Sequence, residues 1–105
     1  MYNNHVIIQN RVCEEFNINP SILFKKSIAR EFLRPRQIFF YFCKKYTNFT
    51  LEHIGALCQH HAIGCQSPET VRNAIKVVDN IYPIDAYFNE VQRIDEKLEK
   101  KLPCN

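Results

Sequence analysis

The sequence predicts an all-α protein, a compact bundle of about six helices. Apolar residues recur at helical intervals, and Pro, Asn, Thr and Gly punctuate them at helix-like spacing. The chain has 105 residues, 46% hydrophobic and 24% charged, which is typical of one folded domain. We therefore expect a single domain over residues 1–105, with a core over 3–82 and a C-terminal helix over 84–102.

The first two helices are predicted by caps and apolar spacing. Asn3 or Asn4 can cap a helix over residues 4–16, which places Val6, Cys13 and Phe16 on one stripe. Asn19-Pro20 is a cap followed by proline at the first helical position, where the missing amide proton costs nothing. A short second helix is expected over 20–24.

A basic stretch precedes the third predicted helix. Residues 25–34 have weak periodicity, and Pro35 disfavours helical geometry at Arg34, so we expect an exposed loop there. From Pro35 a strong helical period runs to residue 46 and makes this helix the hydrophobic centre, through Ile38, Phe39, Phe42, Cys43 and Tyr46. Its aromatic residues favour core packing over stacking on bases.

Three further helices complete the prediction. Thr50 can cap a two-turn helix that includes Gly55, and Ser67-Pro68 repeats the signal of a cap followed by proline. The helix from Pro68 should end near residue 82. The last helix has an apolar stripe formed by Ile84, Tyr87, Val91, Ile94 and Leu98. Two heptads are too few to decide between packing on the domain's own core, which we favour, and a homodimer seam over 84–98.

Charge is unevenly distributed along the chain. Residues 25–45 contain seven basic residues and one acid, whereas residues 79–105 contain six acids and four bases. A local charge of +6 suits a polyanion, with counterion release as the driving force. The alternative is an ordinary solvated surface.

Several short strings of residues are more informative about function than composition or charge. The strings Val12-Cys13-Glu14-Glu15-Phe16, Arg34-Pro35-Arg36-Gln37 and Leu51-Glu52-His53-Ile54-Gly55, together with Thr70-Val71, resemble the C-terminal DNA-binding domain of the bacterial replication initiator DnaA. The resemblance covers roughly residues 6–82. It implies a helical bundle with a basic loop and a helix-turn-helix, which binds double-stranded DNA and acts by site occupancy in replication or transcription control. The alternative is a protein-interaction module that kept the fold and lost base reading.

The resemblance also indicates candidate DNA-binding residues. The arginines of the basic loop suit a narrow minor groove or a phosphate, and the helix from Pro68 should enter the major groove. Of the family's usual base-reading residues only Thr70 and Val71 carry over, so other polar residues nearby become candidates. The predicted set is Lys25, Lys26, Arg30, Arg34, Arg36, Gln66, Ser67, Glu69, Thr70, Arg72, Asn73 and Lys76.

The turn between Gly55 and Val71 is about five residues longer than the family pattern. It contains four potential zinc ligands, Cys58, His60, His61 and Cys65. Their spacing is not a standard zinc signature, so we expect no metal; a buried Cys58 and solvent-facing histidines are the simpler interpretation.

We also expect no enzymatic activity and no cofactor. The sequence has no Gly-rich phosphate loop, and the ATPase portion of the initiator family lies outside these 105 residues, so no nucleotide is expected. No segment suits a membrane span or signal peptide, and five scattered cysteines favour reduced thiols. These features predict a cytoplasmic, nucleoid-associated location.

Overall fold

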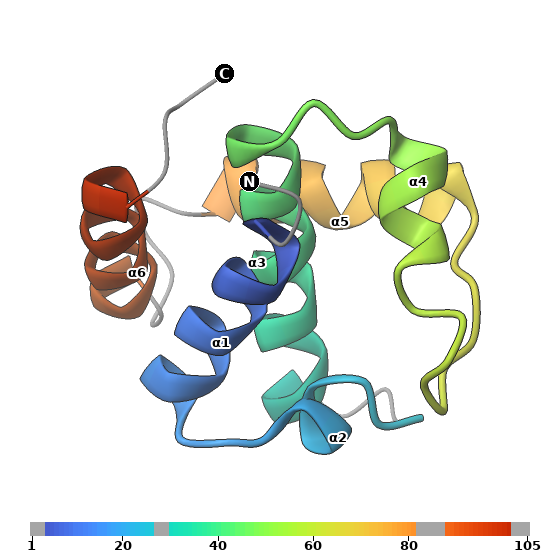
Figure 1. The fold of residues 1–105 in the computed structure, drawn as a ribbon, viewed down its shortest axis with the longest axis horizontal. Coiled ribbons are helices and arrows are strands. Elements are labelled where there is room, and N and C mark those ends of the chain that lie inside the picture. Colours follow the sequence, from blue (N-terminus) through green and yellow to red (C-terminus); the bar gives the residue numbers. More distant parts are fainter. Residues whose placement is uncertain (1–3, 27–29, 82–87, 102–105) are drawn as a thin grey trace.

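A computed structural model describes residues 4–26, 30–81 and 88–101, and all regular structure within them is helical (Figure 1). The helices are α1 (Asn4–Phe16), α2 (Pro20–Leu23), α3 (Arg30–Tyr46), α4 (Leu51–Ala56), α5 (Pro68–Ile81) and α6 (Phe88–Lys101). The predicted all-α class is confirmed. None of the helices in these residues is both long and apolar enough to cross a lipid bilayer.

Helix α3 forms the centre of the bundle. It packs against α1, α2, α4 and α5, and α5 crosses behind it (Figure 1). Phe39, Phe42 and Tyr46 are almost completely buried, so the predicted hydrophobic centre is confirmed. On α1 the predicted stripe is wrong at Val6, which is 37% exposed, because the helix turns Ile8 and other residues inward.

The predicted start of α3 is also wrong. The helix begins at Arg30 rather than at Pro35, and Pro35 lies inside it as a buried residue. The bias of proline against a helical residue before it is local and moderate, and tertiary packing can override it. The predicted exposed loop is therefore shorter: Lys25 and Lys26 are exposed, and Arg34 is helical and partly buried.

Helix α6 packs on α1, and the described part of its apolar stripe lies in the core. Val91, Ile94 and Leu98 are all buried, whereas residues 84 and 87 of the predicted stripe lie outside the described residues. Packing on the domain's own core, the favoured alternative, accounts for these three side chains.

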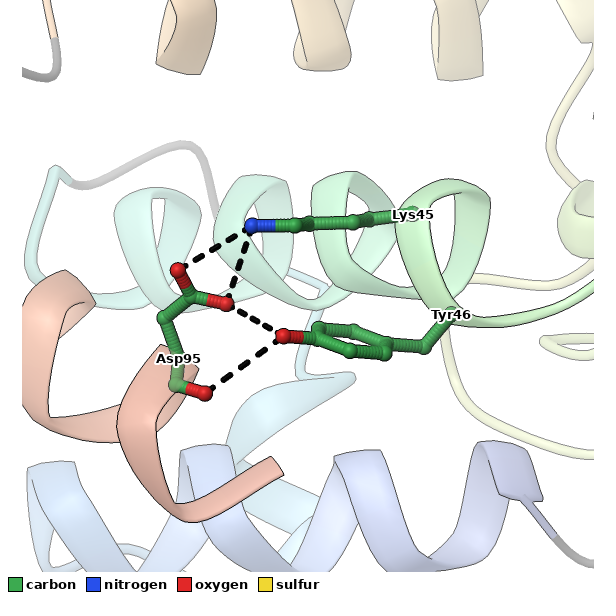
Figure 2. Close-up of polar contacts among 3 residues, drawn as sticks. All are labelled: Lys45, Tyr46 and Asp95. Carbon is green, nitrogen blue, oxygen red and sulfur yellow. Dashed lines mark hydrogen bonds and ion pairs between the residues drawn. The ribbon is translucent and has the colours of Figure 1, made fainter. Parts of the chain in front are cut away.

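Polar contacts fix the position of α6. Figure 2 shows Asp95 accepting two bonds of 3.0 Å from Lys45 Nζ and one of 2.6 Å from the Tyr46 hydroxyl. A second ion pair joins Arg93 to Glu15 on α1 at 2.6 Å. The last helix is thus attached to both α1 and α3.

Candidate nucleic-acid interface

The chain passes from α4 to α5 through the enlarged turn, residues 57–67, which returns against α4 at a glycine. The Gln66 amide donates to the Gly55 carbonyl at 3.0 Å. A Cβ added at Gly55 would lie 1.9 Å from the Gln66 carbonyl oxygen, so no larger residue fits this backbone. This close approach explains why glycine follows Ile54 and sets where α5 begins.

Inside the enlarged turn the four candidate zinc ligands go to different places. Cys58 is fully buried, and burial raises the pKa of its thiol to about 12. His61 stacks on Phe24 with ring centroids 4.2 Å apart, whereas His60 and Cys65 are exposed. Among the described residues, no three His, Cys, Asp or Glu side chains come together as metal ligands.

Three of the predicted base-reading residues shape the start of α5. The Gln66 side-chain amide donates to the Ile63 and Gly64 carbonyls, both at 3.1 Å. Ser67 caps α5, since its hydroxyl accepts from the Thr70 amide at 3.2 Å and lies 3.0 Å from the Thr70 hydroxyl. Each of these three side chains therefore already makes a hydrogen bond within the chain.

The outward face of α5 carries the other four predicted residues. Glu69, Arg72, Asn73 and Lys76 are all exposed at helical spacing, while Val71 and the rest of the apolar stripe lie in the core. Arg72 Nη1 donates to Glu69 Oε1 at 3.0 Å across one turn. The helix is amphipathic, and its polar face is open to a partner.

The basic segment, which we define as residues 25–34, follows α2 and ends within the first turns of α3. Lys25 and Lys26 are exposed, and Arg34 donates from Nη1 to Gln37 Oε1 at 2.6 Å. Arg30 begins α3, but its side chain lies outside the described residues. This segment retains exposed positive charge beside the first turns of α3.

Arg36 differs from its neighbours, because its side chain is only 8% exposed. Its Nε donates to the Leu23 carbonyl at 3.2 Å and its Nη2 donates to the Lys25 carbonyl. Burial lowers the pKa of Arg36, although a guanidinium stays protonated at neutral pH. Arg36 thus ties the end of α2 and the start of the basic segment to α3. Sequence reasoning missed this contact, since nothing local signals a buried arginine.

A cavity of about 240 Å³ lies at the junction of α3 and α5. Its lining includes Arg36 and Gln37 on α3 and Gln66, Thr70 and Asn73 on α5. The cavity therefore brings Arg36 and Gln37 next to the start of the predicted recognition helix, which is far from them in the sequence. Both elements border one hollow in the surface.

The arrangement of α4, the enlarged turn and α5 over α3 defines the class as a helix-turn-helix domain. The family model for the bacterial DnaA protein helix-turn-helix matches residues 6–78, so this chain belongs to that family. The match ends inside α5, and α6 lies beyond it.

Curated relatives agree with this assignment. The chain is 37% identical over 91 residues to the chromosomal replication initiator protein DnaA of Bacteroides thetaiotaomicron, covering 86% of this chain and 18% of that protein. The same initiator from Wolbachia pipientis wMel is 36% identical over 88 residues, covering 83% and 18%. That of Flavobacterium psychrophilum is 34% identical over 92 residues, covering 87% and 18%. The chain thus spans less than a fifth of the length of these relatives, and the resemblance expected from the sequence is confirmed.

Proposed function

We propose that this domain binds double-stranded DNA by placing α5 in the major groove and the basic segment over the adjacent backbone and minor groove. The observation that carries the proposal is the cavity between α3 and α5, which is lined by Arg36 and Gln37, just after the basic segment, and by Gln66, Thr70 and Asn73 at the start of α5. Family membership supports it, because a helix-turn-helix inserts its second helix in the major groove. The domain acts by occupying its site in replication or transcription control.

The charged residues of this interface have different roles. Lys25 and Lys26, together with Lys76 on α5, are exposed and suit phosphate contacts, which position a protein without selecting sequence. Arg34 and Arg30, on the first turns of α3, are the candidates for the minor groove. Arg36 is instead a positioning residue, since its hydrogen bonds to the Leu23 and Lys25 carbonyls hold the start of the basic segment against α3.

A protein-interaction module is the less favoured alternative. Such a module would use the apolar stripe of the C-terminal helix and the enlarged turn as its contact surfaces. The described stripe residues are buried within the domain, and His61 of the turn stacks on Phe24. Those side chains have their packing partners inside the chain.

Fluorescence anisotropy on a random duplex at several salt concentrations tests the proposal. The Lys25→Ala/Lys26→Ala double variant should bind more weakly and lower the salt slope by roughly 2, since each phosphate that a lysine neutralises contributes about 0.9. The matched control is Lys100→Ala/Lys101→Ala, which removes the same charge from exposed positions at the end of α6. Absence of salt-dependent binding, or an equal weakening in both double variants, would refute the proposal.

A further inference from the structure

The exposed ion pair on the first turns of α5 has a donor and acceptor pattern that suits a base pair. We propose that Glu69 and Arg72 together recognise one G·C pair in the major groove, an inference that rests on the proposed function. Glu69 would accept from the cytosine N4 amino group, and Arg72 would donate to guanine O6 and N7.

The position of the pair favours this role. The side chains of Glu69 and Arg72 are 71% and 48% exposed, and they meet at 3.0 Å. Residues near the N-terminus of a recognition helix are the ones that reach base edges. Gln66, Ser67 and Thr70 are uncharged and bond within the turn and the cap, so Glu69 and Arg72 are the first exposed charges on the helix.

The carboxylate is the informative member. Phosphates repel a carboxylate at a DNA surface, so Glu69 is favourable there only if it meets a hydrogen-bond donor. In the major groove the donors are the amino groups of cytosine and adenine. Glu69 therefore restricts the base that it faces to one of these two.

Arg72 distinguishes between them. On a G·C pair the cytosine amino group lies beside two adjacent acceptors, O6 and N7 of guanine, which the guanidinium fork can bind together. On an A·T pair the amino group of adenine lies between two separated acceptors, and the thymine adds a methyl group. The Glu69–Arg72 pair thus matches the edge of G·C and only half of the edge of A·T.

Stability gives only a small competing reason for the pair, because an exposed acid in the first turn of a helix, as Glu69 is in α5, stabilises that helix slightly. An exposed ion pair three residues apart on a helix adds little to folding, so its removal leaves the fold intact. Variants at these two positions can therefore be compared directly for DNA binding.

The test starts from selection of bound duplexes from a random pool with the wild-type domain, followed by anisotropy titration of the selected site and its single base-pair substitutions. We expect one G·C pair whose replacement by A·T weakens wild-type binding by about 5- to 150-fold. Arg72→Ala should abolish that discrimination and Glu69→Ala should reduce it, while salt-dependent binding to random duplex persists in both. Glu69→Gln should shift the preference towards A·T, because glutamine pairs with adenine.

Lys76→Ala is the matched control on the same helix face. It should weaken binding to all duplexes alike, since a phosphate contact carries no sequence information. Salt-dependent binding with unchanged discrimination in Glu69→Ala and Arg72→Ala would overturn this inference and leave the proposed function standing. A complete lack of DNA binding by the wild-type domain would overturn the proposed function itself.

Discussion

Replacement of Gly55 by alanine reverses the usual effect of that substitution in a helix. Alanine normally stabilises a helix by about 1 kcal/mol relative to glycine. Here the added Cβ would lie 1.9 Å from the Gln66 carbonyl oxygen and 2.9 Å from its carbon. Real Cβ contacts essentially never fall below 3.0 Å, so the Gln66 main chain would have to retreat by about 1 Å.

The magnitude follows from what that retreat disturbs. Overpacking of this kind costs about 1–3 kcal/mol, and weakening the bond from the Gln66 amide to Gly55 adds about 1 kcal/mol. The alanine propensity offsets about 1 kcal/mol, which leaves a net loss of about 1–3 kcal/mol in the free energy of unfolding. For a domain of this size Tm should fall by about 4–20 °C. DNA affinity should fall as well, because the displacement moves the start of α5.

Thermal unfolding and duplex titration of Gly55→Ala measure both effects. Gly64→Ala is the control in the same turn: its Cβ would meet nothing within 4 Å, and the φ of +70° costs about 1 kcal/mol in a non-glycine residue. Gly64→Ala should lower Tm modestly and leave DNA affinity near the wild-type value. An unchanged or raised Tm in Gly55→Ala would refute the close approach as the reason for this glycine.

Three further predictions concern elements that support the interface. Arg36→Met should lower the free energy of unfolding by about 2–4 kcal/mol, because two carbonyls would be without their charged donor. Trypsin should also cut the basic segment faster in Arg36→Met than in the control variant Arg34→Met. Equal cleavage rates in the two variants would contradict a positioning role for Arg36. Asp95→Asn should cost about 1–2 kcal/mol in urea unfolding, since it weakens the bonds that attach α6 to α3, while DNA affinity stays unchanged; a comparable fall in affinity would argue against that separation. Burial, and to a smaller extent the charge of His53, lowers the pKa of His5 in the folded protein. The stability that neutral His5 contributes is therefore fully present above pH ~6.5 and is lost as pH falls through its folded pKa. Tm should therefore drop less between pH 7.5 and 5 in His5→Gln than in the wild type, and identical drops would exclude His5 as the cause.

Helix boundaries were predictable wherever a capping residue stood at the start. Asn19 and Thr50 each accept the amide three residues on, and α2 and α4 begin as the sequence predicts. Ser67 does the same for α5. Such caps are local, so the signal lies entirely within four residues of sequence.

The start of α3 and the burial of Arg36 were not predictable in this way. The side chain of Arg36 binds carbonyls 11 and 13 residues earlier, and Pro35 is buried inside α3, so both features involve packing that no local pattern encodes. The candidate DNA-binding residues show the same limit: residue type and position beside the family's base-reading motif indicated Gln66 as a candidate, but only the structure shows its amide bound to its own turn. Residue type identified what these groups can bind, whereas the fold determined which of them stay open.

The stack of His61 on Phe24 has a consequence for how the domain tolerates its longer turn. A longer loop between two helices ordinarily has more conformational freedom, so it fixes the relative position of the two helices less well. Here the added length reaches back to Phe24, at the end of α2 and next to the basic segment (Figure 1). The turn therefore connects α5 with the region where the basic segment begins. Under the proposed binding mode, this aromatic contact helps to fix the distance between the basic segment and α5, and we expect shortening of the turn to change that distance.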